Sequence, residues 1–133
     1  MLCLALNYGN GQMLLKDIAR IEDISEKYLS QIIIPLKAAG LVSSLRGAKG
    51  GYILAKPASQ ITLKEIVEAL EGSLDLVDCI ANPFDCPRVS ICVARDLWME
   101  MGMQMNRTLK NITLADLVKR CREKEENAVM YNI

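Results

Sequence analysis

The sequence contains no histidine, few aromatic residues and no net charge. Without histidine, the chain lacks the side chain most used for acid–base catalysis near neutral pH. It also lacks a glycine-rich nucleotide-binding pattern and a Cys-x-x-Cys redox pair. The sequence therefore predicts no catalytic residue, and a protein that is not an enzyme.

Long apolar runs and targeting segments are also lacking. No stretch approaches the roughly 18 consecutive apolar residues of a membrane span, and the start shows no signal-peptide pattern. Five cysteines are an odd number for a disulfide framework in a chain without a secretory signal. We expect a cytoplasmic protein that does not contact membranes and whose cysteines serve metal or redox chemistry.

The balanced charge hides an asymmetry along the chain. Residues 1–57 contain seven Lys and Arg against four Asp and Glu, whereas residues 58–133 contain nine against twelve. A basic front half and an acidic back half are expected when only the front faces phosphate groups. Neutrality overall argues against a protein that coats nucleic acid by electrostatics alone.

The first part of the chain predicts three helices. Residues 1–8 form an apolar run that a glycine turn stops, and apolar residues recur at helical spacing over 14–19. Ser25 is a good N-cap for the third helix, and Gly40 suits its left-handed end. Pro35 lies inside this third helix, where we expect a kink or a local break.

A hairpin and further helices follow. Residues 41–46 and 52–55 predict two short strands around a glycine-rich turn. Capping boxes at Thr62 and Thr113 each predict a helix start. Between these helices we expect a loop and a long helix over about 92–109, and after the last helix a loose, charged tail.

These elements predict a mainly α fold with a small β-hairpin wing, a winged helix-turn-helix followed by a long dimerisation helix. We expect three parts: a DNA-binding domain over 1–72, a cysteine-bearing loop over 73–92, and the dimerisation and C-terminal helices over 93–133. The wing follows the second helix of the helix-turn-helix. In such folds that helix enters the major groove and the hairpin tip meets the backbone or minor groove.

The chemistry of this first domain suits DNA. Polar groups lie on the early turns of the predicted recognition helix: Ser25, Glu26, Lys27, Tyr28, Ser30 and Gln31. Gln31 could read adenine, and Ser25 or Tyr28 could reach a phosphate. Arg46 and Lys49 place cations in the glycine-rich turn, which lets backbone approach DNA closely. The alternative is a helical pair and hairpin that serve protein interactions.

Three cysteines, Cys79, Cys86 and Cys92, are spaced as C-x6-C-x5-C in the predicted loop. Three thiolates on one loop can converge on one centre, and thiolates suit iron–sulfur clusters or zinc. Zinc sites normally use closer pairs, but the spacing alone leaves both open. Cys3 and Cys121 have apolar or helical neighbours and are expected to be ordinary buried thiols.

The long helix carries an apolar stripe. Residues at four-residue intervals, together with one neighbouring aromatic, make up this stripe: Val93, Leu97, Trp98, Met101, Met105 and Leu109. An apolar face without a second helix to cover it is best buried against a copy of itself, so we expect a homodimer interface here. An intramolecular core is the alternative.

Several runs closely resemble the Rrf-type family of bacterial winged-helix transcription regulators (IscR/NsrR/CymR-like). They are ISEKYLSQ at 24–31, PLKAAGLV at 35–42, RGAKGGY at 46–52, the helix at 66–72 and NITLADL at 111–117. The resemblance covers almost the whole chain. It implies a homodimer that binds an imperfect palindrome in double-stranded DNA. The contacts it implies are made by Ser25, Lys27, Tyr28, Ser30 and Gln31 in the recognition helix and by Arg46, Lys49, Gly50 and Tyr52 in the wing.

The resemblance also implies a cofactor. The cluster-binding branch of the family places three cysteines at similar spacing, which implies an iron–sulfur cluster on Cys79, Cys86 and Cys92. We expect a 2Fe–2S cluster, with 4Fe–4S as the alternative, that senses cluster, redox or nitric oxide status. A thiol switch, a zinc site and a lost cluster remain open, as does a cluster-free CymR-like regulator of sulfur metabolism that acts through a protein partner.

The sequence departs from the family pattern at several points. Arg95 stands where one relative has a histidine ligand, and a guanidinium cannot ligate iron. The remaining candidates for a fourth ligand are Asp96, Glu100, Cys3, water or a small thiol. Ser30 replaces an acidic residue that selects between site classes in that relative, so we expect this discrimination to be absent. Family members also carry further first-helix residues ahead of the position matching Met1, and in relatives that segment touches DNA.

Overall fold

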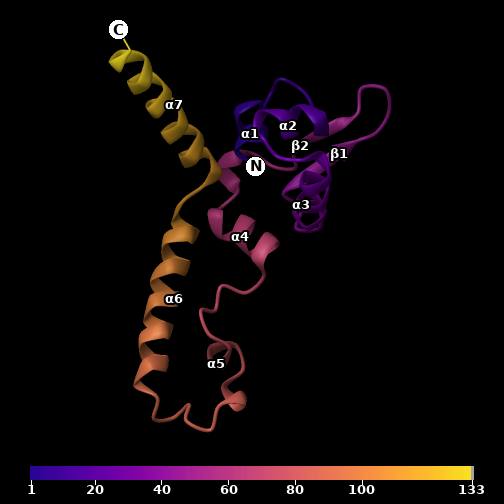
Figure 1. The fold of residues 1–133 in the computed structure, drawn as a ribbon. Coiled ribbons are helices and arrows are strands. Elements are labelled where there is room, and N and C mark those ends of the chain that lie inside the picture. The colour runs from indigo at the N-terminus through magenta and orange to yellow at the C-terminus, as the bar shows by residue number, and fades with distance from the viewer. Residues whose placement is uncertain (133) are drawn as a thin grey trace.

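The computed structural model describes residues 1–132 of the chain (Figure 1). Its helices and strands follow one another in the order α1 Leu2–Leu6, α2 Leu15–Ile21, α3 Glu26–Ala38, β1 Val42–Leu45, β2 Gly51–Leu54, η1 Ala58–Gln60, α4 Leu63–Glu71, α5 Asp78–Ala81, η2 Pro83–Asp85, α6 Val93–Asn111 and α7 Leu114–Tyr131. The expected fold class, mainly helical with one small hairpin, is confirmed.

The helix-turn-helix is formed by α2 and α3, which pack against each other. The Ser25 side chain accepts a hydrogen bond from the Tyr28 N–H, so Ser25 caps α3 as expected. Leu29, Ile33 and Leu36 lie on one side of α3 and are buried. Helical spacing therefore places the polar residues of the first turns on the opposite side, away from the core.

The wing is a two-stranded antiparallel hairpin in which Val42 pairs with Leu54 and Leu45 with Gly51. At Gly50 a side chain would meet the Leu45 carbonyl oxygen at 2.7 Å, and at Gly51 the Met13 carbonyl oxygen at 2.6 Å. Met13 forms a bridge with Tyr52 through backbone hydrogen bonds of 3.0 and 2.8 Å. The hairpin is therefore fastened to the segment that precedes α2.

The starts of α4 and α7 are joined. Both predicted capping boxes are present, with Thr62 and Thr113 as N-caps. The Leu63 N–H donates to the Ile112 carbonyl at 2.9 Å, and the Leu114 N–H donates to the Ile61 carbonyl at 2.8 Å. Ile61 and Leu114 are fully buried beside this junction, which attaches α7 to the head, where α7 packs against α1 and η1.

We refer to residues 1–62 as the head and to residues 63–112 as the arm. In the head, α1, α2, α3 and the hairpin enclose the core. In the arm, α4 leads down to α5, and α6 returns alongside to the head (Figure 1). Among residues 1–132, every buried hydrophobic residue belongs to the head except Leu114, which starts α7. No residue of the arm is buried.

The expected local break at Pro35 and the expected loose tail are both wrong. The helix α3 continues through Pro35 without a break. Proline removes only its own donor, and the Gln31 carbonyl thereby left free belongs to an exposed residue that water can reach. The charged tail is helical to Tyr131 rather than loose, because its Arg, Glu and Lys residues are strong helix formers.

The expected loop also contains more structure than its prolines suggested. The short helices α5 and η2 lie between the end of α4 and the start of α6. None of the helices within residues 1–132 has the length and apolar character needed to cross a lipid bilayer.

Candidate DNA interface and cysteine loop

The outward side of α3 carries the predicted base-reading residues. Lys27 and Gln31 are exposed and lie one turn apart, opposite the buried Leu29 and Leu36. Ser30 is half-buried, and its hydroxyl donates to the Lys27 carbonyl at 2.6 Å. Two acceptor lone pairs of that hydroxyl remain for a ligand. Tyr28 is 57% exposed at the flank of this surface.

The wing turn presents two cations. Arg46 and Lys49 are exposed. The ion pairs found in residues 1–132 join Arg20 with Asp17, Lys56 with Glu65 and Lys64 with Glu68, so neither wing cation is neutralised. Both charges are therefore available to phosphate groups.

Two of the predicted wing residues, Gly50 and Tyr52, stabilise the backbone conformation of the wing. Gly50 donates its N–H to the Gly47 carbonyl at 2.9 Å, and no side chain fits there. Tyr52 is half-buried, and its backbone pairs with Met13 on one side and with Ser44 of the hairpin on the other. These two residues hold the shape of the wing, and Arg46 and Lys49 supply its charge.

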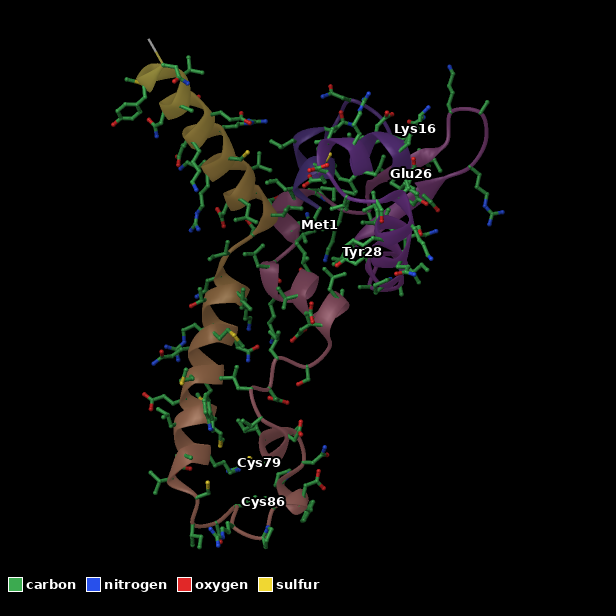
Figure 2. The ribbon with its side chains drawn as sticks, viewed as in Figure 1. Met1, Lys16, Glu26, Tyr28, Cys79 and Cys86 are labelled. Carbon is green, nitrogen blue, oxygen red and sulfur yellow. The ribbon has the colours of Figure 1, made fainter. Side chains whose placement is uncertain are left out.

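Sequence reasoning missed three residues of this surface. The Gln12 side-chain amide donates to the Lys49 carbonyl and so clamps the wing turn to the head. Lys16 is an exposed cation at the start of α2, and Figure 2 places it with Glu26 and Tyr28 on the side of the head that carries the wing. Ile34 is 67% exposed and continues the outward row of Lys27 and Gln31. The run of three isoleucines at 32–34 could have indicated this, because one face of a helix cannot bury three consecutive side chains.

The three loop cysteines lie at the end of the arm farthest from the head. Cys79 is in α5, Cys86 follows η2, and Cys92 is the N-cap of α6. Figure 2 shows Cys79 and Cys86 in this distal loop. All three are half-buried free thiols.

The structure does not gather these thiols into a coordination sphere. Within residues 1–132, no group of three or more His, Cys, Asp or Glu side chains is arranged to hold a metal ion. The donor set nevertheless fits an iron–sulfur cluster in its chemistry, because three accessible thiols share one short loop that packs on α6. Arg95, one turn into α6, has a buried Nε atom without a hydrogen-bond partner among the described residues. The site therefore offers three soft donors beside an unsatisfied cation.

The candidates for a fourth ligand lie on α6 and in the head. Asp96 and Glu100 are exposed on α6. Cys3 is buried in the core of the head, where burial and, secondarily, the Glu22 carboxylate raise the pKa of its thiol. The expectation of an ordinary buried thiol is confirmed for Cys3. It is wrong for Cys121, which is half-buried and lies 3.8 Å from Glu125 Oε1 on the exposed part of α7.

The helix α6 has two different sides. Met99, Gly102 and Asn106 share a hollow with Leu76 and Ile80, so this side faces the loop. The predicted stripe lies largely outside that side: Val93, Leu97, Trp98 and Met101 are exposed, and Met105 and Leu109 are half-buried. No residue of α6 is buried within the described chain. The alternative of an intramolecular core for this stripe is therefore wrong.

The head thus combines a capped helix with an outward polar row and a hairpin whose turn carries free cations. This is the arrangement of a winged helix-turn-helix DNA-binding protein.

Comparison with known proteins identifies the family. The family model for Rrf2, described as iron-dependent transcriptional regulator, matches residues 1–120. The HTH-type transcriptional regulator IscR of Klebsiella pneumoniae is 39% identical over 118 residues, 89% of this chain and 72% of the relative. The chain belongs to the Rrf2 family of transcriptional regulators.

Two solved structures of regulators have a similar fold and sequence. T. potens IscR has 37% sequence identity and a TM-score of 0.75, covering 92% of this chain and 80% of that chain. CymR, the global cysteine regulator of B. subtilis, has 35% identity and a TM-score of 0.74, covering 90% of this chain and 87% of that chain. The chain is therefore a DNA-binding regulator and not an enzyme.

Proposed function

We propose that this protein is a homodimeric transcription regulator that binds an imperfect palindrome and senses iron–sulfur, redox or nitric oxide status through Cys79, Cys86 and Cys92. The observation that carries the proposal is that three half-buried thiols lie in the loop that packs on α6 and leads into it, while the same helix exposes an apolar stripe. The proposed sensor site and the proposed dimer contact then both lie at the helix α6. Residues 1–72 bind DNA, 73–92 hold the cofactor, and 93–133 pair the two copies.

On DNA, the outward row of α3 enters the major groove. Gln31 reads an adenine edge, Lys27 donates to a neighbouring acceptor, and Ile34 suits a thymine methyl group. The Ser30 hydroxyl, which donates to the Lys27 carbonyl, accepts from a donor group on a base. Ser25 and Tyr28 reach the flanking phosphates. Arg46 and Lys49 contact the backbone from the wing, held there by Gly50 and Tyr52.

Dimer formation follows from the exposed stripe. Leu97 and Met101 are 55% and 46% exposed in the single chain. Burying such side chains against a second copy of α6 removes apolar surface from water, at about 25 cal/mol for each Å² buried. A symmetric pair of α6 helices also places the two α3 helices on opposite sides of a two-fold axis, as a palindrome requires.

The cysteines connect the cofactor to this dimer. An iron–sulfur cluster bound at three thiolates supplies a redox-active group, of the 2Fe–2S or 4Fe–4S type. Convergence of Cys79 and Cys86 on Cys92 requires the loop to close against the start of α6. Because α6 carries the dimer stripe, this closure shifts the spacing of the recognition helices. The protein acts in the bacterial cytoplasm, where thiols stay reduced.

Purification without oxygen tests the cofactor part. The expected product absorbs visible light and contains iron and acid-labile sulfide, and both are lost when Cys79, Cys86 or Cys92 is replaced by alanine. Cys121→Ala is the matched control, because Cys121 is a half-buried thiol outside the loop. A colourless protein after reconstitution with iron and sulfide contradicts this part of the proposal.

Operator binding tests the coupling. The affinity for a palindromic DNA site, measured at fixed salt with and without the cofactor, is expected to differ. Equal affinities in the two states would overturn the coupling while leaving DNA binding intact.

A second candidate function has its own support. The thiols are not gathered in the structure, and the fold matches CymR, whose description is a cysteine regulator. A cluster-free regulator of sulfur metabolism that acts through a protein partner would take up no iron under the conditions above, and its DNA affinity would be indifferent to reconstitution.

A further inference from the structure

One charged side chain in the arm, Arg95, has a buried nitrogen atom without a hydrogen-bond partner among the described residues. Arg95 is half-buried, and the atom without a partner is its Nε. The ion pairs of the described residues do not include it. It is the one buried side-chain nitrogen or oxygen atom of the described chain that is left unsatisfied.

Helical spacing places Arg95 on the loop side of α6. It lies one turn before Met99, which contributes with Gly102 to the hollow shared with Leu76. It also lies three residues after Cys92, so the two residues are neighbours on one face of the helix. The guanidinium therefore belongs to the side of α6 that faces the cysteine loop.

Such a group is costly unless it is paired. A buried donor without a partner has lost its hydrogen bond to water and gained none in exchange, and the loss is greater when the donor is charged. The loop contains carboxylates at Asp75, Asp78 and Asp85, yet all three are exposed, and none forms an ion pair with Arg95. The three loop thiols, of which Cys92 is three residues away on the same helix, can provide an anionic acceptor once they are deprotonated and bound to iron.

We propose that Arg95 is a positioning residue for the iron–sulfur group, donating a charge-assisted hydrogen bond from Nε to a cysteine or cluster sulfur. This inference rests on the proposed function. Arg95 does not bind iron, since a guanidinium has no free lone pair for a metal. Its part is to offset the negative charge that the three thiolates bring into a half-buried loop.

Two consequences follow from electrostatics. A hydrogen bond and a positive charge at the sulfur atoms stabilise the more negative, reduced state, so Arg95 raises the reduction potential. The same contact holds the loop closed and slows the loss of iron. Without the cofactor, Arg95 has no partner to lose, so its removal does not destabilise the fold.

Three variants separate these effects. Arg95→Met removes the charge and the donor while keeping the length of the side chain, and Arg95→Lys keeps only the charge. Arg107→Met is the control, because Arg107 is an exposed arginine on the same helix. The midpoint potential of the reconstituted protein, the rate at which a chelator removes iron, and the unfolding temperature of the iron-free protein are measured for each.

In Arg95→Met we expect a more negative potential, iron removal several-fold faster than in the control, and an iron-free unfolding temperature equal to or above that of the unsubstituted protein. Arg95→Lys should retain most of the potential but lose iron faster than the unsubstituted protein. A potential and an iron-loss rate equal to those of Arg107→Met overturn the inference. So does an iron-free protein that unfolds at lower temperature with an unchanged potential, which indicates a purely structural arginine.

The outcome also distinguishes this inference from the function on which it rests. If the unsubstituted protein takes up no iron and sulfide, the proposed function fails, and the role of Arg95 fails with it. If the unsubstituted protein takes up both while Arg95→Met behaves like the control, only the role of Arg95 is wrong.

Discussion

The head and the arm differ in how far a single chain completes them. In the head, Leu29, Ile33, Leu41 and Ile61 are buried by residues of the same chain. In the arm no residue is buried, although Leu97, Met101 and Phe84 are large and apolar. The arm therefore leaves a large apolar surface exposed and one buried guanidinium nitrogen, Arg95 Nε, without a partner, as a region that other molecules complete would. The comparison teaches that a single chain completes the core of the DNA-binding head, whereas it does not complete the arm, to which we assign sensing and dimer formation.

The sharpest test of this difference compares a core residue with an arm residue. Leu114→Ala, at the fully buried junction of α4 and α7, should lower the free energy of unfolding by about 2–5 kcal/mol through lost packing and a cavity. Phe84→Ala in the arm should change it by less than about 0.5 kcal/mol, because Phe84 is fully exposed. Urea denaturation of both variants measures this. Equal losses would mean that the arm is as well packed as the head.

A second test asks whether another copy of the chain completes the arm. The double change Leu97→Asp and Met101→Asp should give a folded monomer, because charge in the stripe cannot be buried without cost. Affinity for a palindromic operator should fall on the order of a hundred-fold, since only one half-site is held at a time.

Met103→Asp is the matched control for the stripe, because Met103 is 61% exposed on another side of α6. Sedimentation equilibrium gives the mass, and titration of labelled DNA gives the affinity. A dimer that survives the double change would refute the assignment of the stripe.

A third test concerns the charge of the head. Arg46→Ala and Lys49→Ala should each weaken DNA binding for all sequences and make the dependence of log affinity on log salt shallower by about 1. Lys124→Ala, an exposed lysine on α7, should leave both unchanged. Binding isotherms at several salt concentrations provide the slopes. Unaltered slopes in the wing variants would mean that the wing does not contact phosphate.

The smallest expected effect is at the junction between the two regions. The Lys56 ammonium and then the Thr62 backbone N–H hold the pKa of Glu65 below its ordinary value of 4.5. A lowered carboxylate pKa stabilises the folded state above pH 4.5, and this contribution disappears as the pH falls through the lower, folded-state pKa.

Glu65→Gln should therefore cost at most about 1 kcal/mol at neutral pH, since the ion pair is partly exposed. The cost should vanish in acid. Thermal unfolding of both proteins between pH 7 and pH 2.5 measures the difference, and a cost that persists unchanged at the lowest pH would contradict the assignment.

The sequence predicted most of the head because its information is local. Ser25 and the two capping boxes mark helix starts, and Gly40 marks a helix end. Each does so through contacts within a few residues. Pro35 and the charged tail misled for the same reason. Pro35 was judged by the hydrogen bond it removes, without knowing that Gln31 is exposed, and the tail was judged by its charge rather than by its helix propensity.

The candidate sites likewise contain some residues that the sequence predicted and others that only the structure revealed. The polar residues of α3 and the wing cations were visible as residue types in a recognisable order of elements. The role of Gln12 could not be predicted from the sequence, because its hydrogen bond to the Lys49 carbonyl joins segments far apart in the chain. The cysteine spacing indicated a shared centre. The burial of Arg95 Nε without a partner could not be predicted, because it depends on which other segments pack against α6.

The sequence by itself therefore determined the element order, the helix caps, the outward row of α3 and the set of cysteines, since each depends on neighbours along the chain. Only the tertiary structure decided that the apolar stripe stays uncovered, that Met13 and Gln12 anchor the wing, and that the Nε atom of Arg95 is buried without a partner among the described residues. These features depend on burial and on long-range contacts, which arise only when distant segments exclude water from one another.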